Sequence, residues 1–384
     1  MAPTGQVLGD WTTAMFQEGH DIQVICSQKS YDGGKLYEKQ EAINGIIVQR
    51  IAALGFGRKT FIGKLADYLS FYVQTFFKVF FGPRFDRVII LTTPPYLGLL
   101  VKIACSLKGT KRIHWIMDVY PDVMSAFGML KKKSLLYKNL AWISAYELKG
   151  AYKVIVLGPD MKEVVGKYVK DKSILEMVPL WGDGSLRPMH REKTKFNNLR
   201  GWEKHKFVGL YSGNMGLGHC LEDVLQLTAD PEVKEASFHF AFSGGGKRRK
   251  QVEDFVNKKS IGNAEMLEYV PLVELNDHLN CADFHFASIN PDWNGMMVPS
   301  KLQGIFAIGK PVVCIGSEDS SLGQWIKQAD AGWIIKPGDY EKLKQTLLNF
   351  NDEILQIKGD NARRYSKRFF NKEMNCDKLT KLLN

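Results

Sequence analysis

The residues best suited to chemistry form a glycine-rich turn within the stretch KFVGLYSGNMGLGH, residues 206–219. An apolar run precedes Gly213, and residues 220–227 have helical spacing, which predicts a strand, a turn and a helix. Such a turn can hold a phosphate, because glycine lets the backbone come close and a helix start presents free N–H groups. The spacing is G-x-x-G-x-G, not the G-x-G-x-x-G of dinucleotide-binding proteins. The turn therefore predicts a phosphate site or, equally, only tight packing of strand against helix.

A second glycine cluster, residues 244–246, is followed directly by Lys247, Arg248 and Arg249. It comes after a predicted strand at residues 237–242 and before a predicted helix. Glycine backbone beside ammonium and guanidinium groups suits a phosphate, so this is a second candidate cradle. The alternative is the exposed start of a basic helix.

Two further side chains stand at positions where ligands bind. Asp118 follows the predicted strand 112–115, and ligands of parallel sheets bind at the carboxyl ends of the strands. A helix cap at Asp118 or Asp122 is the alternative. Lys301 begins a predicted helix at residues 300–308, where the helix dipole disfavours a cation unless an anion is present. This position predicts a phosphate ligand, with a solvated lysine as the alternative.

The elements that must position these residues alternate between strand and helix. Strands are expected at residues 21–26, 43–51, 88–91, 112–115, 153–157, 206–211, 237–242, 264–270, 284–288, 311–315 and 332–335. This alternation predicts an α/β protein with parallel sheets covered by helices on both faces. We place a domain boundary in the polar connection that starts near residue 178, giving domains 1–185 and 186–365. Residues 366–384 are expected to form a helix that packs back on the first domain.

The first domain begins unusually. A doubly wound sheet normally starts with a strand, but residues 1–20 predict a loop and then a helix that ends at Gly19. Either the true start of the domain lies upstream of Met1, or this domain lacks its first strand, which is apparently missing.

Composition limits the function classes. A chain of 384 residues is long enough for two domains, and its six cysteines are dispersed without a C-x-x-C pair, which indicates a reducing compartment and no structural zinc. No secretory signal opens the sequence. Of the net charge of +11, residues 1–185 carry +8, with 24 Lys and Arg against 16 Asp and Glu. This charge suits an anionic membrane or a polyphosphate, and no nucleic-acid module accompanies it.

An aromatic segment runs from Phe61 to Phe81. Leu65, Tyr68, Leu69, Tyr72, Phe76 and Phe80 fall near one helical face, and charged residues interrupt the segment. It is therefore amphipathic and not a spanning helix. The pattern favours a helix buried against its own sheet, and the alternative is a surface that enters the membrane interface.

Several motifs occur in a specific order along the chain. They are YSGNMG with His219, FSGGGKR at residues 242–248, VPSKL with Gly304, the segment AIGKPV at residues 307–312, and Gly332-Trp333 followed by Pro337-Gly338-Asp339. Residues 115–121, residues 177–183 and Gly5 with Gly19-His20 add to the pattern. Together they resemble family 4 glycosyltransferases, and more narrowly the bacterial group that builds colanic acid, O-antigen and other envelope polysaccharides. The resemblance covers nearly the whole chain.

The resemblance implies a GT-B fold, in which two Rossmann-like domains face each other across the active-site cleft. The first domain would serve the acceptor and the second would bind a UDP- or GDP-linked sugar. Donor-binding residues carried over by the motifs are Gly5, Gly213, Asn214, Met215, Gly216, His219, Gly245, Gly246, Lys247, Arg248, Val270, Pro271, Ser300, Lys301 and Gly304. Asp118 is the acceptor-side candidate for catalysis.

The sequence also departs from the family. The wider family has two glutamates, eight residues apart, that touch the donor; here Gly304 takes the second position and the first is missing near Met296. Met117 stands where a histidine often precedes the acid, and Leu180 stands where asparagine is usual.

The function implied is a retaining transfer of a hexosyl or N-acetylhexosaminyl group to a lipid-linked saccharide, at the cytoplasmic face of the plasma membrane. No D-x-D motif occurs, so we expect no metal and no other cofactor. Alternatives are a catalytically impaired homologue that binds nucleotide sugars or a partner, and a GT-B nucleotide-sugar epimerase, for which no acid and base pair is identifiable. A dehydrogenase would need the missing G-x-G-x-x-G.

Overall fold

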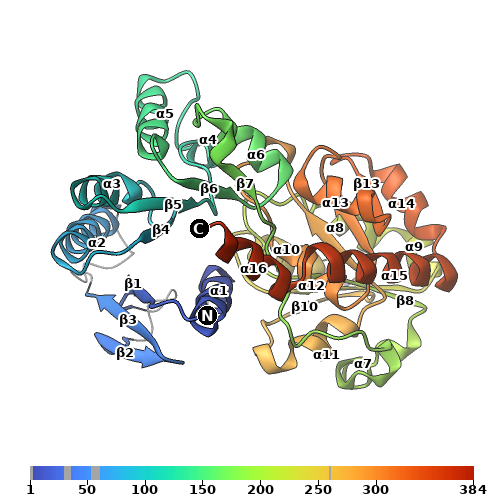
Figure 1. Cartoon of the computed structure of the whole chain (residues 1–384). Coiled ribbons are helices and arrows are strands. Elements are labelled where there is room, and N and C mark those ends of the chain that lie inside the picture. Colours follow the sequence, from blue (N-terminus) through green and yellow to red (C-terminus); the bar gives the residue numbers. More distant parts are fainter. Residues whose placement is uncertain (1–2, 30–35, 53–60, 259–260) are drawn as a thin grey trace. The chain divides into compact units, whose positions relative to one another are not determined.

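The structure, a computed structural model, describes residues 3–29, 36–52, 61–258 and 261–384 (Figure 1). The chain divides into two compact units. Unit 1 comprises Met1–Pro179 and Lys372–Asn384, and unit 2 comprises Leu180–Asn371. The chain therefore leaves unit 1 once and returns to it for its last residues.

Within the described residues, the strands of unit 1 form two sheets, with the orders β1-β3-β2 and β4-β5-β6-β7. Neighbouring strands are parallel except β2, which is antiparallel to β3. The strands are β1 (Gln23–Ser27), β2 (Gln40–Ile43), β3 (Ile46–Ile51), β4 (Arg87–Leu91), β5 (Lys111–Trp115), β6 (Lys153–Val156) and β7 (Leu175–Met177). The helices are α1 (Pro3–Gln17), α2 (Phe61–Phe81), α3 (Leu97–Lys108), α4 (Asp122–Ala126), α5 (Leu135–Leu148), α6 (Pro159–Gly166), η1 (Lys172–Ile174) and α16 (Lys372–Lys381).

The last residues of the chain are bonded to the first unit at several points. The indole N–H of Trp11 on α1 donates to Thr380 Oγ1 on α16 at 3.2 Å. The Arg87 Nε–H donates to the Leu383 carbonyl at 2.8 Å, and the Tyr152 hydroxyl donates to the Asn384 carbonyl at 2.7 Å. These bonds make α16 an integral element of unit 1.

Helix α2 has two different apolar faces. Val79 is buried in a cluster with Ile90 of β4 and Val101 of α3, and Phe76 and Phe80 pack against that cluster. Leu69, Val73, Phe77 and Phe81, spaced four residues apart, are exposed. The buried face agrees with the first alternative, a helix that packs against its own sheet. The other face leaves aromatic and aliphatic side chains exposed to solvent.

In the residues of unit 2 that the structure describes, six parallel strands form a sheet in the order β10-β9-β8-β11-β12-β13. The strands are β8 (Phe207–Ser212), β9 (Phe238–Ser243), β10 (Ala264–Leu267), β11 (Phe284–Ser288), β12 (Val312–Ile315) and β13 (Gly332–Ile335). The helices are η2 (Arg191–Lys193), α7 (Lys195–Arg200), η3 (Trp202–Lys204), α8 (Glu222–Ala229), α9 (Pro231–Glu235), α10 (Arg249–Lys258), η4 (Leu272–Glu274), α11 (Leu275–Asn280), η5 (Pro291–Trp293), α12 (Lys301–Ala307), α13 (Ser321–Ala329), α14 (Tyr340–Leu348) and α15 (Asp352–Phe369).

The order of this sheet reverses direction at β8. The chain proceeds outward from β8 to β9 and β10, then returns to β11 beside β8 and continues outward on the other side. Ligands of doubly wound sheets bind at such a switch point, beyond the carboxyl ends of the strands. The core beneath it is rich in phenylalanine, with Phe207, Phe238, Phe240, Phe242, Phe284 and Phe286 almost fully buried.

The predicted α/β class with parallel sheets is confirmed, and most predicted elements occur within one or two residues. The prediction of a single strand at residues 43–51 is wrong. Asn44 and Gly45 have φ values of 51° and 84°, so the chain turns there and forms the β2–β3 hairpin. The predicted loop at the start is already helical from Pro3.

Candidate functional site

The first glycine turn lies at the switch point of unit 2. It follows β8, and the imidazole Nδ1 of His219 at its far end is hydrogen-bonded to the carbonyl of Ser288, the last residue of β11. The backbone N–H of Cys220 donates to Ser288 Oγ at 2.7 Å. The turn is therefore fixed between the carboxyl ends of the two central strands, where a bound ligand would lie.

The second glycine cluster interlocks with the first. The Met215 N–H donates to the Gly245 carbonyl at 2.6 Å, and the Arg248 N–H donates to the Met215 carbonyl at 3.0 Å. Gly246 has φ of +117°, and a Cβ there would lie 2.4 Å from Asn214 Oδ1. A Cβ at Gly244 would lie 2.2 Å from the Gly213 carbonyl oxygen. Any side chain at these two glycines would push the turns apart, so the close backbone approach requires glycine.

Lys301 joins this pair of turns from the start of α12. Its Nζ–H groups donate to the Tyr211 hydroxyl and, at 3.1 Å, to the Asn214 carbonyl. The ammonium lies 3.7 Å from the centre of the Tyr211 ring, and its Cε would lie 2.8 Å from a Cβ placed on Gly213. Burial lowers the pKa of Lys301. Within the described ranges no carboxylate pairs with this cation, since its partners are neutral.

The neighbouring arginines, by contrast, have acidic partners. Arg248 donates to the His219 carbonyl and pairs with Glu222 of α8. Arg249 pairs with Glu268, which follows β10. Burial first, and then the positive charge of Lys301, lowers the pKa of His219 to about 3, so this histidine is neutral. Arg248 and Arg249 therefore help to hold the turns, while the charge of Lys301 has no anionic partner.

The structure brings together only part of the predicted donor set. Asn214, Met215, Gly216, His219, Gly245, Gly246, Lys247, Arg248 and Lys301 lie on or beside the two turns, and Ser300 directly precedes α12. Val270 and Pro271 follow β10 at the same end of the sheet, one residue beyond Tyr269, whose ring lies near Gly244 and Gly245. Gly304 faces Leu186 and Leu279, because a Cβ there would lie 3.6 and 3.8 Å from their methyl carbons. Gly5 lies in α1 of unit 1.

Tyr211 and Tyr269 are neighbours of this site that the sequence did not single out. Tyr211 is fully buried, and the ring of Tyr269 is exposed beside the second glycine cluster. The position of each at the end of a strand was visible in the sequence. The directions of their side chains depend on how three strands pack together. No local pattern in the sequence predicts that packing.

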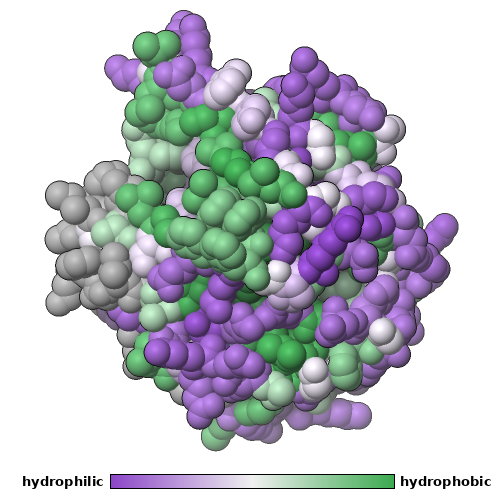
Figure 2. Space-filling view, turned by 60° about the vertical axis from the view of Figure 1, so that its left-hand side comes forward, coloured by the Kyte–Doolittle hydropathy of each residue, from purple (hydrophilic) through white to green (hydrophobic). Residues whose placement is uncertain are grey.

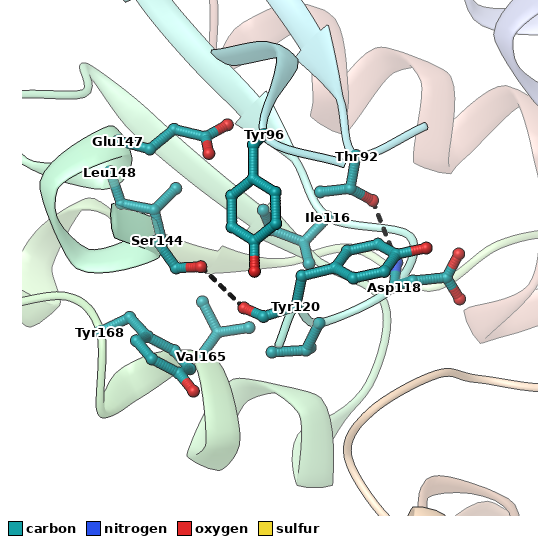
Figure 3. Close-up of a pocket in the computed structure, with 11 residues that line it drawn as sticks. Thr92, Tyr96, Ile116, Asp118, Tyr120, Ser144, Glu147, Leu148, Val165 and Tyr168 are labelled. Atoms are coloured by element: carbon teal, nitrogen blue, oxygen red, sulfur yellow. Dashed lines mark hydrogen bonds between the residues drawn. The ribbon is translucent and has the colours of Figure 1, made fainter. Parts of the chain in front are cut away.

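In unit 1, Asp118 lines a pocket beyond the carboxyl ends of β4 and β5, beside α5 and α6 (Figure 3). Other residues around it include Thr92, Tyr96, Tyr120, Ser144, Glu147 and Tyr168. The backbone N–H groups of Met117 and Asp118 both donate to Thr92 Oγ1, at 3.0 and 3.1 Å. Figure 3 shows the hydroxyl of Tyr120 and the carboxylate of Asp118 on the same side of the pocket, with Glu147 on the other side of Tyr96. The pocket is thus lined by hydroxyls and aromatic rings, the groups that suit a sugar ring.

Neither acid considered for a helix cap has that role. The N-cap of α4 is Pro121, with no side-chain cap bond. Asp122 instead accepts hydrogen bonds from the hydroxyls of Tyr137 and Tyr168, at 2.9 and 2.5 Å. It orients Tyr168 at the pocket wall, while the carboxylate of Asp118 remains available to a ligand.

Burial dominates the electrostatics of this pocket. It raises the pKa of Asp118 to about 6. It also raises the pKa of Glu147 to about 7, against the lowering effects of the Gly98 N–H, Arg112 and Lys102. His114 lies 3.8 Å from Glu147, but burial and the nearby Arg112 lower its pKa to about 3, so it is neutral. Near neutral pH the pocket therefore holds one ionised carboxylate, at Asp118, and one that is close to half protonated, at Glu147.

A surface of exposed apolar side chains lies on the helices of unit 1. It comprises Tyr68, Leu69, Val73, Phe77 and Phe81 of α2, Ile103 and Leu107 of α3, and Leu135, Leu136, Trp142 and Tyr146 of α5. Helices α2 and α3 lie side by side on the part of the molecule that Figure 2 turns toward the viewer, where hydrophobic side chains gather. We call it the α2–α3–α5 surface. Among the helices described, none is long and apolar enough to cross a membrane, and these residues contain no group of three or more His, Cys, Asp or Glu arranged for a metal.

Comparisons with known proteins find glycosyltransferases among the proteins similar to this chain. No family model matches the chain. The chain is 26% identical to the probable glycosyltransferase WbjE of Pseudomonas aeruginosa over 71% of its length and 67% of that protein. It is 23% identical to the putative colanic acid biosynthesis glycosyl transferase WcaI of Escherichia coli K12, over 96% and 93% of the two chains.

Among solved structures, the glycosyltransferase WaaG, involved in lipopolysaccharide biosynthesis, has a TM-score of 0.70 at 17% identity, covering 99% of this chain and 96% of its own. Sucrose-phosphate synthase from Thermosynechococcus elongatus has a TM-score of 0.76 at 14% identity, covering 99% and 92%. This chain is a GT-B glycosyltransferase. These comparisons confirm the predicted resemblance to family 4 glycosyltransferases, the predicted GT-B fold and the predicted transferase class. The HepE protein of Anabaena, in complex with UDP-glucose, has a TM-score of 0.66 at 12% identity, covering 88% and 86%.

Proposed function

We propose that this GT-B glycosyltransferase transfers a sugar from a UDP- or GDP-linked donor to a lipid-linked saccharide during cell-envelope polysaccharide biosynthesis. The names of WcaI and WaaG, which refer to colanic acid and lipopolysaccharide biosynthesis, support the pathway class. The complex of HepE with UDP-glucose supports a nucleotide-sugar donor.

The observation that carries the proposal is the partly buried ammonium of Lys301 at the two glycine turns, paired with neutral oxygens only. A cation removed from water without a counter-ion is unfavourable, and a diphosphate would supply the missing negative charge. Backbone N–H groups of the glycine turns would add hydrogen bonds to the same oxygens. As the sugar leaves, charge grows on the diphosphate, and a fixed cation stabilises that charge.

On the acceptor side, we assign Asp118 as the residue that contacts the hydroxyl to be glycosylated. Its carboxylate stands at the edge of a pocket lined by tyrosine and serine hydroxyls. A partly buried carboxylate with a pKa of about 6 is ionised at pH 7 and can accept a hydrogen bond from an incoming hydroxyl. The transfer retains the anomeric configuration and needs no metal, in line with the family resemblance and the missing D-x-D motif.

We also propose that unit 1 binds the cytoplasmic face of the plasma membrane through the α2–α3–α5 surface. Exposed Leu69, Phe77, Phe81 and Trp142 supply apolar area, and Lys131, Lys132 and Lys133 precede α5 in sequence. Apolar insertion together with basic residues is the combination that binds anionic bilayers. A lipid-linked acceptor would be met at that surface.

A second candidate is a catalytically impaired homologue that binds nucleotide sugars. It is favoured by Met296, which is buried near the position of the family's first glutamate, and by Gly304, which faces Leu186 and Leu279. These positions supply no carboxylate to the donor. The epimerase alternative has no comparable support.

The experiment that tests the proposal has two steps. Isothermal titration measures donor binding and its metal dependence. The full chain is titrated with UDP, GDP and uridine, each with EDTA and with Mg²⁺. Incubation with a panel of labelled nucleotide sugars and a polyprenyl-diphosphate-linked saccharide then reads transfer by mass spectrometry. Binding with EDTA followed by transfer is the expected result. Binding without transfer to any lipid-linked acceptor would favour the impaired homologue, and binding that requires Mg²⁺ would contradict metal independence.

A further inference from the structure

The pocket around Asp118 has two acidic residues in its wall. They are Asp118 and Glu147, and the described residues that line the pocket include no lysine, arginine or histidine. Figure 3 shows the two carboxylates on opposite sides of Tyr96. The other polar side chains of the wall carry hydroxyls, from Thr92, Ser144 and several tyrosines. A ligand in this pocket therefore meets carboxylate and hydroxyl oxygens.

Neither carboxyl group is neutralised by an ion pair inside the pocket. In the described ranges no basic side chain pairs with Asp118, whose pKa is raised by burial. The carboxylate of Glu147 accepts a hydrogen bond from the backbone N–H of Gly98. It lies 3.8 Å from His114 Nδ1, and this histidine is neutral. The two carboxyl groups thus have no cation in direct contact.

Two cations lie near Glu147, but their charged groups are bonded to the end of α5. The Arg112 Nη1–H and Nη2–H groups donate to the carbonyls of Glu147 and Lys149, each at 3.1 Å. The Lys102 ammonium donates to the carbonyl of Lys149 at 3.0 Å and to that of Tyr146. The C-terminal end of a helix carries partial negative charge, which these cations offset. Both cations also favour the ionised form of Glu147, and neither lines the pocket.

The hydroxyl of Tyr96 is a buried polar group in the pocket wall. Within the described residues it has no hydrogen-bond partner. The neighbouring hydroxyl of Ser144 donates instead to the Tyr120 carbonyl, at 2.8 Å. Tyr96 also has φ of 62°, a left-handed conformation that is uncommon for tyrosine, and its ring centroid lies 6.1 Å from that of Tyr120. Buried hydroxyls normally have partners, and a hydroxyl of a bound sugar would supply the missing one.

We propose that this pocket selects acceptors whose terminal sugar carries no negative charge, and that it excludes uronic acids and phosphorylated sugars. The inference rests on the proposed function, in which Asp118 lies on the acceptor side. Hydroxyl groups of an uncharged sugar can donate hydrogen bonds to both carboxylates, which only accept them when ionised. An anionic sugar would instead bring its charge beside two like charges in a partly buried site, and such repulsion rejects the wrong ligand. Asp118 and Glu147 are thus specificity-determining residues for the acceptor.

Matched pairs of acceptors test this selection. The members of each pair are polyprenyl-diphosphate-linked disaccharides that end in glucose or glucuronic acid, or in galactose or galacturonic acid. At pH 8, above the pKa values of about 6 for Asp118 and about 7 for Glu147, kcat/KM should be at least about tenfold higher for the neutral member. Titration of the lipid-free disaccharides, without donor, should give the same order of affinity. Discrimination in this titration without any transfer would contradict the proposed transfer and support the charge selection.

Two variants locate the discrimination in the pocket wall. Glu147→Gln and, separately, Asp118→Asn should each lower the ratio of neutral to acidic affinity by at least about threefold, because each removes a negative charge and keeps hydrogen-bonding atoms. Glu163→Gln, which removes an exposed carboxylate of α6, should leave this ratio unchanged. If Glu147→Gln fails to fold, Asp118→Asn decides.

Four outcomes would overturn the proposal. They are equal binding of the two members of both pairs, tighter binding of the acidic member, no binding of any of the disaccharides, and a ratio that neither pocket variant changes.

Discussion

The ammonium group of Lys301 lies 3.7 Å above the centre of the Tyr211 ring while donating hydrogen bonds to the hydroxyl of the same tyrosine and to the Asn214 carbonyl. These neutral partners hold the side chain in position without neutralising its charge. The lysine is thus arranged in advance for an anion, and the first prediction concerns its removal.

Lys301→Ala should weaken nucleoside diphosphate binding by about tenfold to more than a hundredfold, corresponding to the roughly 1.5 to 3 kcal/mol of a charge-assisted hydrogen bond. Binding of the bare nucleoside should hardly change. The melting temperature without ligand should stay the same or rise, because a poorly compensated cation is removed. Lys327→Ala, which removes a cation from the exposed pair with Glu318, is the matched control. Equal weakening of nucleoside and nucleoside diphosphate would contradict the assignment.

Gly246→Ala should destabilise the two interlocked turns. The φ of +117° and the 2.4 Å approach to Asn214 Oδ1 leave no room for a Cβ, so we expect a loss of about 1 to 3 kcal/mol in unfolding free energy and weaker diphosphate binding. Gly262→Ala is the control, since no atom lies within 4 Å of a Cβ at that position. Calorimetry measures the first effect and titration the second. If Gly246→Ala changed neither the unfolding free energy nor diphosphate binding, the turns would not be held as tightly as described.

Asp118→Asn should stabilise the protein in alkaline but not in acidic solution. The folded pKa of about 6 lies above the usual value, so the ionised form is disfavoured by folding, and this penalty grows as the pH rises from about 4 through 6. Above pH 7 the variant should be more stable by on the order of 2 kcal/mol, and at pH 4 the two proteins should melt together. Asp86→Asn, at an exposed position, is the matched control. Transfer activity should fall in Asp118→Asn even where stability rises, and retained activity would remove Asp118 from the acceptor site.

Membrane binding should depend on charge and on the α2–α3–α5 surface separately. Replacing Lys131, Lys132 and Lys133 with glutamine should weaken binding to anionic vesicles by about a hundredfold at low salt, at roughly 1 kcal/mol per cation, and by much less at high salt. Phe77→Ser with Phe81→Ser should weaken binding at both salt concentrations, because apolar insertion is not screened. Val273→Ser alters a residue of unit 2 that is 92% exposed and should change nothing. Equal sedimentation of all variants with anionic and neutral vesicles would refute membrane binding through this surface.

The sequence was sufficient for the elements whose signals are local. Phe61–Phe81 coincides with α2, because the helical spacing of its apolar residues extends over several turns. The Asn44-Gly45 turn was missed within an apolar run, although this dipeptide is itself a hairpin signal. Residues of the candidate donor site came from glycine and lysine motifs, and the structure brings most of them together.

Other features were beyond local patterns. The pocket around Asp118 gathers residues from Thr92 to Tyr168, which become neighbours only when β4, β5 and β6 pair. The contact of Gly304 with Leu186 and Leu279 depends on how α12 is rotated against α11. No local pattern in the sequence indicated that Tyr211, one residue before the end of β8, would hold Lys301.

The return of α16 to unit 1 has a consequence for the order in which the protein folds during synthesis. Unit 2 has all of its residues once Asn371 has left the ribosome. Unit 1 starts first, yet Trp11, Arg87 and Tyr152 find their partners Thr380, Leu383 and Asn384 only after all of unit 2 has been synthesised. Domains usually fold one after another from the N-terminus. In this chain the second unit can be complete before the first, and the nascent first unit keeps an exposed face until the last helix arrives.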